Sequence, residues 1–164
     1  MNLQKLFLTF FGSGLSPIAP GTVGTFAALI VGVVILYFLG YETLFSLIFA
    51  TTIIGVLEID KYEKKFNIHD DKQIVIDEAV GIWLTLVITN SLSKLLPNSY
   101  SILIVSILSF ISFRLFDILK PSTIGWIDRN IKGGLGVMFD DIFAAIAAGA
   151  LNLLLIYGIF KLFS

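Results

Sequence analysis

The sequence predicts an all-α protein, a bundle of membrane-embedded helices, and three observations carry that prediction. Hydrophobic residues make up 57% of the 164 residues and charged residues only 14%, whereas soluble domains have about 45–50% and about 25%. Five apolar stretches follow one another along the chain. Lipid offers backbone groups no water to bond, so a segment that crosses it has to be a helix or part of a closed barrel. An unusually hydrophobic soluble bundle is the alternative.

The five apolar stretches differ in length, and only the first and the last approach the roughly 20 residues that cross a bilayer as a helix. Three arrangements are open for each shorter middle stretch. Its helix extends into the polar flanks, lies partly at the membrane interface, or is buried inside the bundle. We expect all five to be helical. They cover residues 23–39, 44–57, 79–89 (or 79–96), 102–113 and 142–160.

The basic residues predict an orientation for these helices. If the N-terminus is cytoplasmic and all five stretches cross, the cytoplasmic segments are residues 1–22, 58–78 and 114–141. These segments contain nine of the eleven Lys and Arg residues, as the positive-inside rule expects. They also contain eleven of the twelve acids, with Glu42 the exception, although the acids did not enter the assignment. The charged chemistry is therefore gathered on one membrane face.

Composition also limits the classes of function. A net charge of −1 provides no basic field for nucleic acid. The absence of cysteine excludes disulfides, thiolate metal sites and a cysteine nucleophile. The short apolar run at the N-terminus, followed by Gly-Ser-Gly, does not fit a cleaved signal peptide. The length suits one domain over residues 1–164, and no linker or internal repeat divides it.

The first polar segment of interest is GSGLSPIAPGTVGT, residues 12–25. Glycines let the backbone approach a ligand closely, and a helix start offers free N–H groups to a phosphate. Thr22 occupies the position expected for an N-cap of the first long helix. An ordinary Gly/Pro turn that enters a membrane helix is the alternative. The candidate phosphate donors are the hydroxyls of Ser13, Ser16, Thr22 and Thr25.

Two pairs of acids are expected at the starts of apolar helices. Asp77 and Glu78 precede the third stretch, and Asp140 and Asp141 precede the fifth. One acid suffices to cap a helix or to complement its dipole. Two acids near lipid depth need a cation or partner that offsets their desolvation. Carboxylate oxygens are the ligands that Mg²⁺ prefers, so these four residues are the predicted metal ligands.

Arg114, Asp117 and Lys120 are spaced three apart before Pro121, which is expected to end their helix. On a helix they form one charged stripe. A surface ladder of ion pairs is one interpretation. The other is a phosphate site, in which Asp117 orients two cations suited to phosphate oxygens. Beside carboxylates and Mg²⁺, such cations indicate a phosphoryl-transfer site.

The sequence resembles the phosphatidylglycerophosphatase A family. The resemblance rests on GSGLSPIAPGTVGT (12–25), IDEAVGIW (76–83) and FRLFDILKP…DRN…GGLGVMFDDIFAA (113–145), in the family's order. One departure is Ala144-Ala145, where an Ala-Gly pattern is expected, which changes packing only. The resemblance implies a bacterial inner-membrane enzyme, whose active face the distribution of basic residues assigns to the cytoplasm. Its Mg²⁺-dependent reaction would convert phosphatidylglycerophosphate to phosphatidylglycerol and phosphate, a step of phospholipid biosynthesis.

The resemblance also assigns roles to the matching residues. The expected catalytic acids are Asp77, Glu78, Asp117, Asp140 and Asp141, and the expected substrate contacts are Arg114, Lys120 and Asp128 with the hydroxyls of residues 12–25. Two other functions stay open, a membrane transport or binding protein that uses the same acids and a catalytically silent relative. Transporter acids typically lie near the bilayer midplane on broken helices, whereas these are expected at helix mouths. An oligomer is compatible with the sequence, which specifies no state.

Overall fold

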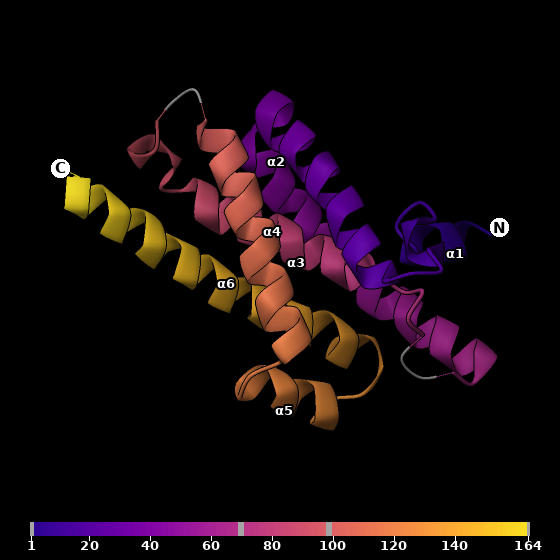
Figure 1. Ribbon diagram of the computed structural model, residues 1–164. Helices are drawn as coiled ribbons and strands as arrows, with labels where there is room; N and C mark the ends of the chain where they lie inside the picture. The colour runs from indigo at the N-terminus through magenta and orange to yellow at the C-terminus, as the bar shows by residue number, and fades with distance from the viewer. Residues whose placement is uncertain (1, 69–70, 98–99, 164) are drawn as a thin grey trace.

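The computed structural model describes residues 2–68, 71–97 and 100–163 (Figure 1). Within these ranges all regular structure is helical, which confirms the predicted all-α class. The elements are α1 (Leu3–Leu8), η1 (Ser13–Leu15), α2 (Pro20–Phe66), α3 (Ile76–Asn90), η2 (Ser93–Leu95), α4 (Ser101–Leu119), α5 (Thr123–Asn130) and α6 (Gly133–Phe163), where η marks a 3₁₀ helix.

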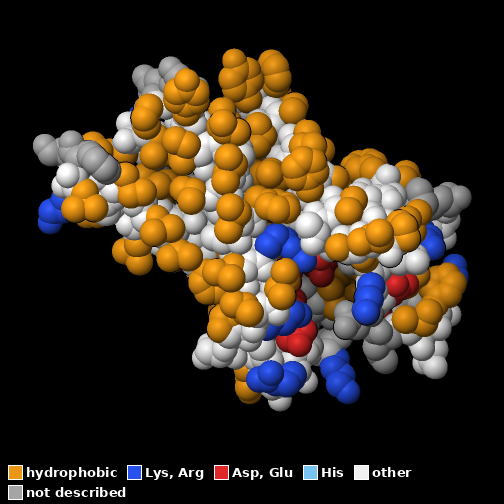
Figure 2. All heavy atoms as spheres, in the orientation of Figure 1, with side chains coloured by type: hydrophobic (Ala, Val, Ile, Leu, Met, Phe, Trp, Pro, Cys, Tyr) orange, Lys and Arg blue, Asp and Glu red, His pale blue; other side chains and the backbone are white. Residues whose placement is uncertain are grey.

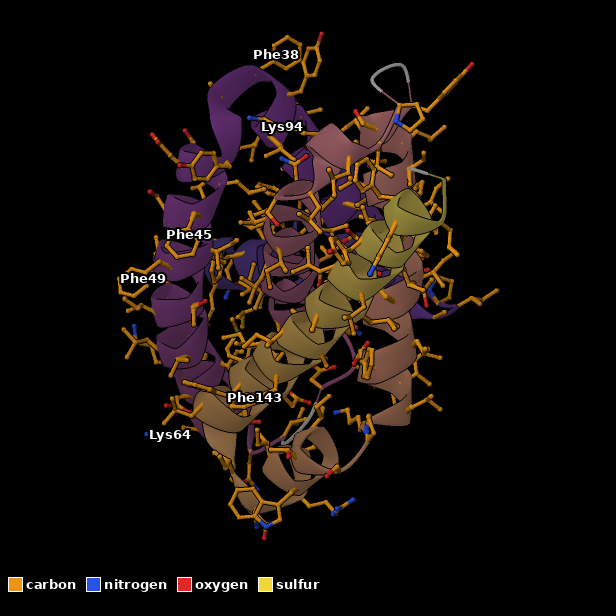
Figure 3. The ribbon with its side chains drawn as sticks, turned by 90° about the vertical axis from the view of Figure 1, so that its left-hand side faces the viewer. Phe38, Phe45, Phe49, Lys64, Lys94 and Phe143 are labelled. Atoms are coloured by element: carbon orange, nitrogen blue, oxygen red, sulfur yellow. The ribbon has the colours of Figure 1, made fainter. Side chains whose placement is uncertain are left out.

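Helix α2 is a helical hairpin rather than one continuous rod. Gly40 has φ 81° and ψ 171°, a conformation that glycine adopts far more readily than other residues. The chain reverses there, and the second arm returns alongside the first (Figure 1). Figure 3 shows Phe38 near the turn and Phe45, Phe49 and Lys64 in succession down the returning arm. The apolar stretches 23–39 and 44–57 are thus the two arms of this hairpin.

Helix α3 lies at the centre of the bundle and packs against α2, α4 and α6. Val80, Ile82 and Leu86 on this helix are fully buried. The Trp83 indole N–H donates to the backbone carbonyl of Ala28 on α2 at 2.8 Å, which satisfies a polar group that would be costly in an apolar interior. A helix enclosed by its neighbours has little contact with lipid, so 15 residues suffice for α3.

The outer surface is apolar. Phe26, Phe38, Phe45 and Phe49 are exposed by 55–73%, and hydrophobic side chains cover most of the face in Figure 2. Among the described residues, α2, α4 and the range Gly133–Leu162 of α6 are long and apolar enough to cross a bilayer. The protein is therefore a membrane protein, whose exposed phenylalanines lipid would cover.

A buried polar cluster joins three helices inside the apolar bundle. The Asn152 side-chain amide on α6 donates to the Thr89 hydroxyl on α3 and to the Ser112 hydroxyl on α4, both at 2.9 Å. Interhelical hydrogen bonds of this kind contribute about 0.6 kcal/mol each within membranes. The cluster therefore stabilises the relative register of α3, α4 and α6.

Helix starts differ from the sequence-based expectations at two points. α6 begins at Gly133, so Asp140 and Asp141 lie about two turns inside the helix rather than at its start. α2 begins at Pro20 with Ala19 as its N-cap, instead of Thr22, because proline suits the first helical position. α3 ends at Asn90, so the third apolar stretch has the shorter of its two expected extents. Helix α4 ends at Leu119, just before Pro121, as expected.

Candidate active site: a charged pocket at the helix ends

A pocket of about 950 Å³ opens at the end of the bundle that carries α5. Both ends of the α2 hairpin, the start of α3, the end of α4, α5 and the first turns of α6 contribute to its wall. Its charged lining consists of the acids Glu63, Asp71, Asp77, Glu78, Asp117, Asp128, Asp140 and Asp141 and the bases Lys72, Arg114, Lys120 and Lys132. Figure 2 shows acidic and basic side chains gathered around this hollow.

Glu78 stands where α2, α3 and α4 meet. Its Oε1 lies 3.4 Å from Arg114 Nη1 on α4. On the α2 side it lies so close to the Gly21 backbone that a Cβ added at Gly21 would overlap Oε1. The same Arg114 nitrogen pairs with Asp117 one turn along α4 and lies 3.4 Å from the Thr25 hydroxyl oxygen. The guanidinium therefore links two of the predicted catalytic acids.

Burial makes ionisation of the acids at the start of α3 unfavourable. Desolvation raises the pKa of Asp77 well above its usual range, and the charges of Glu78 and Asp140 raise it further. Desolvation, followed by the charge of Asp117, raises the pKa of Glu78 to about 8, although Arg114 opposes this shift. Both shifts follow from crowding carboxylates in a poorly solvated space. A cation in the pocket would lower both pKa values.

Lys120 connects the end of α4 to α5 and α6. It has the left-handed conformation at the C-cap of α4, with φ 42°. Its Nζ donates to Asp128 Oδ1 at 2.5 Å and to Asp140 Oδ2 at 2.6 Å. Burial lowers the pKa of this ammonium, but the two carboxylates outweigh that effect and raise the pKa above its ordinary value. Lys120 is therefore held as a cation.

The acids supply the donor atoms that a divalent cation requires, without forming a complete cage. Asp77 Oδ1, Glu78 Oε2 and Asp141 Oδ2 are buried and accept no hydrogen bond. Oxygen atoms of this kind suit a hard cation such as Mg²⁺. In residues 2–68, 71–97 and 100–163, no three His, Asp or Glu side chains are already grouped as metal ligands. The donor set fits Mg²⁺ in its chemistry, and side-chain rotation would have to close the ligand shell.

The predicted charged residues share this pocket, whereas the predicted hydroxyl donors do not line it. Of residues 12–25, only Pro20 and Gly21 contribute to the lining. The Ser13 hydroxyl donates to the Phe10 carbonyl at 2.8 Å, and the Ser16 hydroxyl donates to the Ile18 carbonyl at 2.9 Å.

The two predicted threonine donors, Thr22 and Thr25, also lie outside the pocket lining. The Thr25 hydroxyl donates to the Gly21 carbonyl at 2.8 Å, one turn earlier in α2. Thr22 is half-buried near the start of α2. The hydroxyls of Ser13, Ser16 and Thr25 thus stabilise local backbone structure in this arrangement. Substrate contact by the four hydroxyls stays a prediction.

Sequence reasoning missed Asp60, which fixes the start of α6. Asp60 lies on the returning arm of α2, and its Oδ1 accepts a hydrogen bond from the Gly134 N–H at 2.7 Å. Gly133 has φ 75°, and a Cβ there would crowd Asp60 Oδ1. An acid near the end of an apolar helix reads in the sequence as an ordinary surface charge, because its partner lies 74 residues away.

Comparison with known proteins agrees with the pocket's chemistry. The sequence model of the phosphatidylglycerophosphatase A family matches residues 6–156. A phosphatidylglycerophosphatase A of Escherichia coli K12 is 41% identical over 92% of this chain and 82% of its own length. Its Haemophilus influenzae counterpart is 36% identical over 90% and 85%. A provisionally named phosphatidylinositol-3-phosphatase of Bacteroides thetaiotaomicron is 34% identical over 88% and 87%.

No solved structure matches the chain, so the family assignment rests on sequence. The match spans all three blocks of charged residues that meet in the pocket. Relatives of this identity cover most of both chains, so a common fold and reaction class follow. The chain belongs to the phosphatidylglycerophosphatase A family and is a phosphoric monoester hydrolase.

Proposed function

We propose that the protein removes the terminal phosphate of phosphatidylglycerophosphate in a Mg²⁺-dependent reaction. The observation that carries this proposal is the charged pocket, in which three buried carboxylate oxygens lack a hydrogen-bond donor. Asp77, Glu78, Asp140 and Asp141 are the proposed ligands of Mg²⁺. When bound, Mg²⁺ would offset the charge of the phosphoryl group and polarise it toward attack.

The two central cations have complementary roles in this proposal. Arg114 is held by Asp117 and Glu78, yet its Nε is buried and donates to no described group. A phosphate oxygen would satisfy that nitrogen, and arginine suits bidentate contact with phosphate. Lys120, kept charged by Asp128 and Asp140, would supply a second positive charge near the transferred group.

We also propose that the five apolar stretches cross the bacterial inner membrane, with the pocket on the cytoplasmic side. The described residues that line the pocket all fall within 1–22, 58–78 and 114–141, the segments that the positive-inside rule assigns to the cytoplasm. The α2 hairpin supports two crossings within a single element. A pocket built from helix ends favours an enzyme that meets lipid headgroups over a transporter with a midplane site.

The test is phosphate release from phosphatidylglycerophosphate by detergent-purified protein, with Mg²⁺ or with a chelator. We expect release that requires Mg²⁺ and is lost in Asp141→Asn. Circular dichroism of the variant in the same detergent would show that it is folded. Absence of release under any metal from folded wild-type protein would favour the transport or silent-relative alternatives.

A second substrate comes from the Bacteroides relative, whose name points to phosphatidylinositol 3-phosphate. That lipid and phosphatidylglycerophosphate share one arrangement. Each has a terminal phosphomonoester on a polyol, and a phosphodiester joins the polyol to diacylglycerol. Parallel assays with the two lipids would separate the candidates. The greater identity to the two phosphatidylglycerophosphatases favours phosphatidylglycerophosphate.

A further inference from the structure

Two lysines of the pocket differ from the other two cations in having no acid partner among the residues that the structure describes. Arg114 and Lys120 each bind carboxylates. Lys72 and Lys132 line the same pocket and are exposed. Neither ammonium has an ion pair or side-chain hydrogen bond among the described residues. These two charges are therefore available to a ligand in full, whereas part of the charge of the central cations is already balanced by the pocket's own acids.

The turn that carries Lys72 is held in place by the preceding residue. Asp71 Oδ2 accepts a hydrogen bond from the Tyr62 hydroxyl of α2 at 2.9 Å. Asp71 Oδ1 accepts another from the Gln73 N–H at 3.0 Å, and the Asp71 carbonyl accepts one from the Ile74 N–H at 2.8 Å. The backbone on both sides of Lys72 is thus anchored, so its side chain starts from a defined place at the pocket.

The backbone that carries Lys132 is anchored independently. Lys132 lies between α5 and α6, directly before Gly133. Asp60 of α2 binds the N–H of Gly134, two residues later, at 2.7 Å. On the other side, the Ile131 N–H donates to the Ile127 carbonyl of α5 at 2.9 Å. Two loops far apart in the sequence therefore each present an ammonium to the same pocket, and neither ammonium is paired with a described acid.

The charge balance of the pocket indicates that Lys72 and Lys132 would offset the negative charge of a second phosphate group. Among the described residues, eight acids and four bases line it, and two of these bases are already paired with acids. A substrate with two phosphates would therefore meet excess negative charge. A bound Mg²⁺ would act on the phosphomonoester that is cleaved, which leaves the phosphodiester without a partner. Exposed ammonium groups are flexible point charges that suit a phosphate oxygen without fixed geometry.

We infer that Lys72 and Lys132 bind the phosphodiester of the substrate and thereby select lipids with two phosphates over lipids with a single phosphomonoester. This inference rests on the proposed lipid phosphatase function and names a specificity subsite of the same pocket. The diester of a neighbouring membrane lipid offers the same chemistry, so the test has to separate the two sources.

The test compares two water-soluble substrates in uncharged detergent without added phospholipid. Deacylated glycerophosphoglycerophosphate retains the diester, and glycerol 3-phosphate lacks it. We expect Lys72→Gln and Lys132→Gln each to raise KM for the first substrate about 3-fold, and about 10-fold together, as for exposed charge pairs. KM for glycerol 3-phosphate and kcat for both substrates should stay within about 2-fold, because the site of bond cleavage is unchanged.

The control variant is Lys64→Gln, because Lys64 lies on α2 outside the pocket lining and projects away from the bundle in Figure 3. Equal losses on both soluble substrates would overturn the inference. So would a loss seen only in vesicles of anionic phospholipid, which would assign the lysines to bulk membrane lipid.

A binding measurement separates this inference from the proposed reaction. Calorimetric titration with glycerophosphoglycerol, which contains the diester alone, should show weaker binding in the double variant than in wild type. Lysine-dependent binding without phosphate release would contradict the proposed reaction and leave the subsite standing. Phosphate release with binding that does not depend on the lysines would contradict the subsite alone.

Discussion

Glu78 is a side chain whose burial is costly for folding, and the proposed reaction gives it a role as a metal ligand. Its side chain is 14% exposed, and burial raises its pKa to about 8. Near neutral pH the metal-free folded state therefore disfavours the charge that a metal ligand needs. Such perturbed groups in a cleft are typical of functional sites. In the proposed reaction, a bound Mg²⁺ would offset this cost.

Glu78→Gln is the first prediction at this scale. The amide keeps the shape of the side chain but cannot carry its charge, so we expect phosphatase activity to fall by about 100-fold or more, as for the loss of a key electrostatic group. Without metal at pH 7, the variant should unfold at the same or a higher temperature, because the buried acid is gone. A large loss of stability would instead assign Glu78 a structural role.

Gly21→Ala tests the close approach of α2 to the same carboxylate. A Cβ at this position would overlap Glu78 Oε1, so the side chain of Glu78 has to move. We expect activity to fall by about 10-fold or more, since misplaced catalytic groups are costly, while helix content is retained. Gly158→Ala is the matched control, because no atom lies within 4 Å of the Cβ built there. Similar effects of the two substitutions would contradict this role for Gly21.

At the scale of elements, the position of α6 depends on its contact with the second arm of α2. Asp60 binds the Gly134 N–H, and a Cβ on Gly134 would overlap the Val56 carbonyl oxygen. The first turn of α6 is thus placed directly against α2. Asp140 and Asp141 follow about two turns later. This contact therefore determines where the two acids lie relative to the other residues of the pocket.

Asp60→Ala should therefore destabilise the start of α6 and reduce activity together. Loss of a helix-capping side chain costs about 1 kcal/mol. The expected result is a lower midpoint of unfolding in mixed detergents and a higher Mg²⁺ concentration for half-maximal activity. Asp60→Asn keeps an oxygen acceptor and should restore most of both properties. If Asp60→Asn were as impaired as Asp60→Ala, the negative charge itself would matter rather than the cap.

For the whole molecule, the proposed topology predicts which residues are accessible from each side of the membrane. The chain contains no cysteine, so single cysteines introduced as Lys65→Cys and Lys94→Cys can be labelled without background. With the pocket in the cytoplasm, a membrane-impermeant maleimide should label position 94 in intact spheroplasts and position 65 only after lysis. Labelling of both positions in intact spheroplasts would contradict an odd number of crossings between them.

Much of the fold could be predicted because its causes are local. Hydropathy marked the apolar helices, and Pro121 marked the end of α4. The paired acids were recognised because two charges near an apolar helix are costly. The start of α6 was missed because glycines at 133, 134 and 136 indicate a loop, whereas close packing against the Val56 carbonyl favours glycine within this helix.

By itself, the sequence determined the helical class and identified the acids and cations that line the pocket, since composition and spacing carry that information. Only the tertiary structure decided which of these cations are paired with carboxylates. It paired Arg114 with Glu78 and Lys120 with Asp140, residues 36 and 20 positions apart, and left Lys72 and Lys132 unpaired among the described residues. Such pairings depend on how helices pack, and packing is settled by contacts between distant segments.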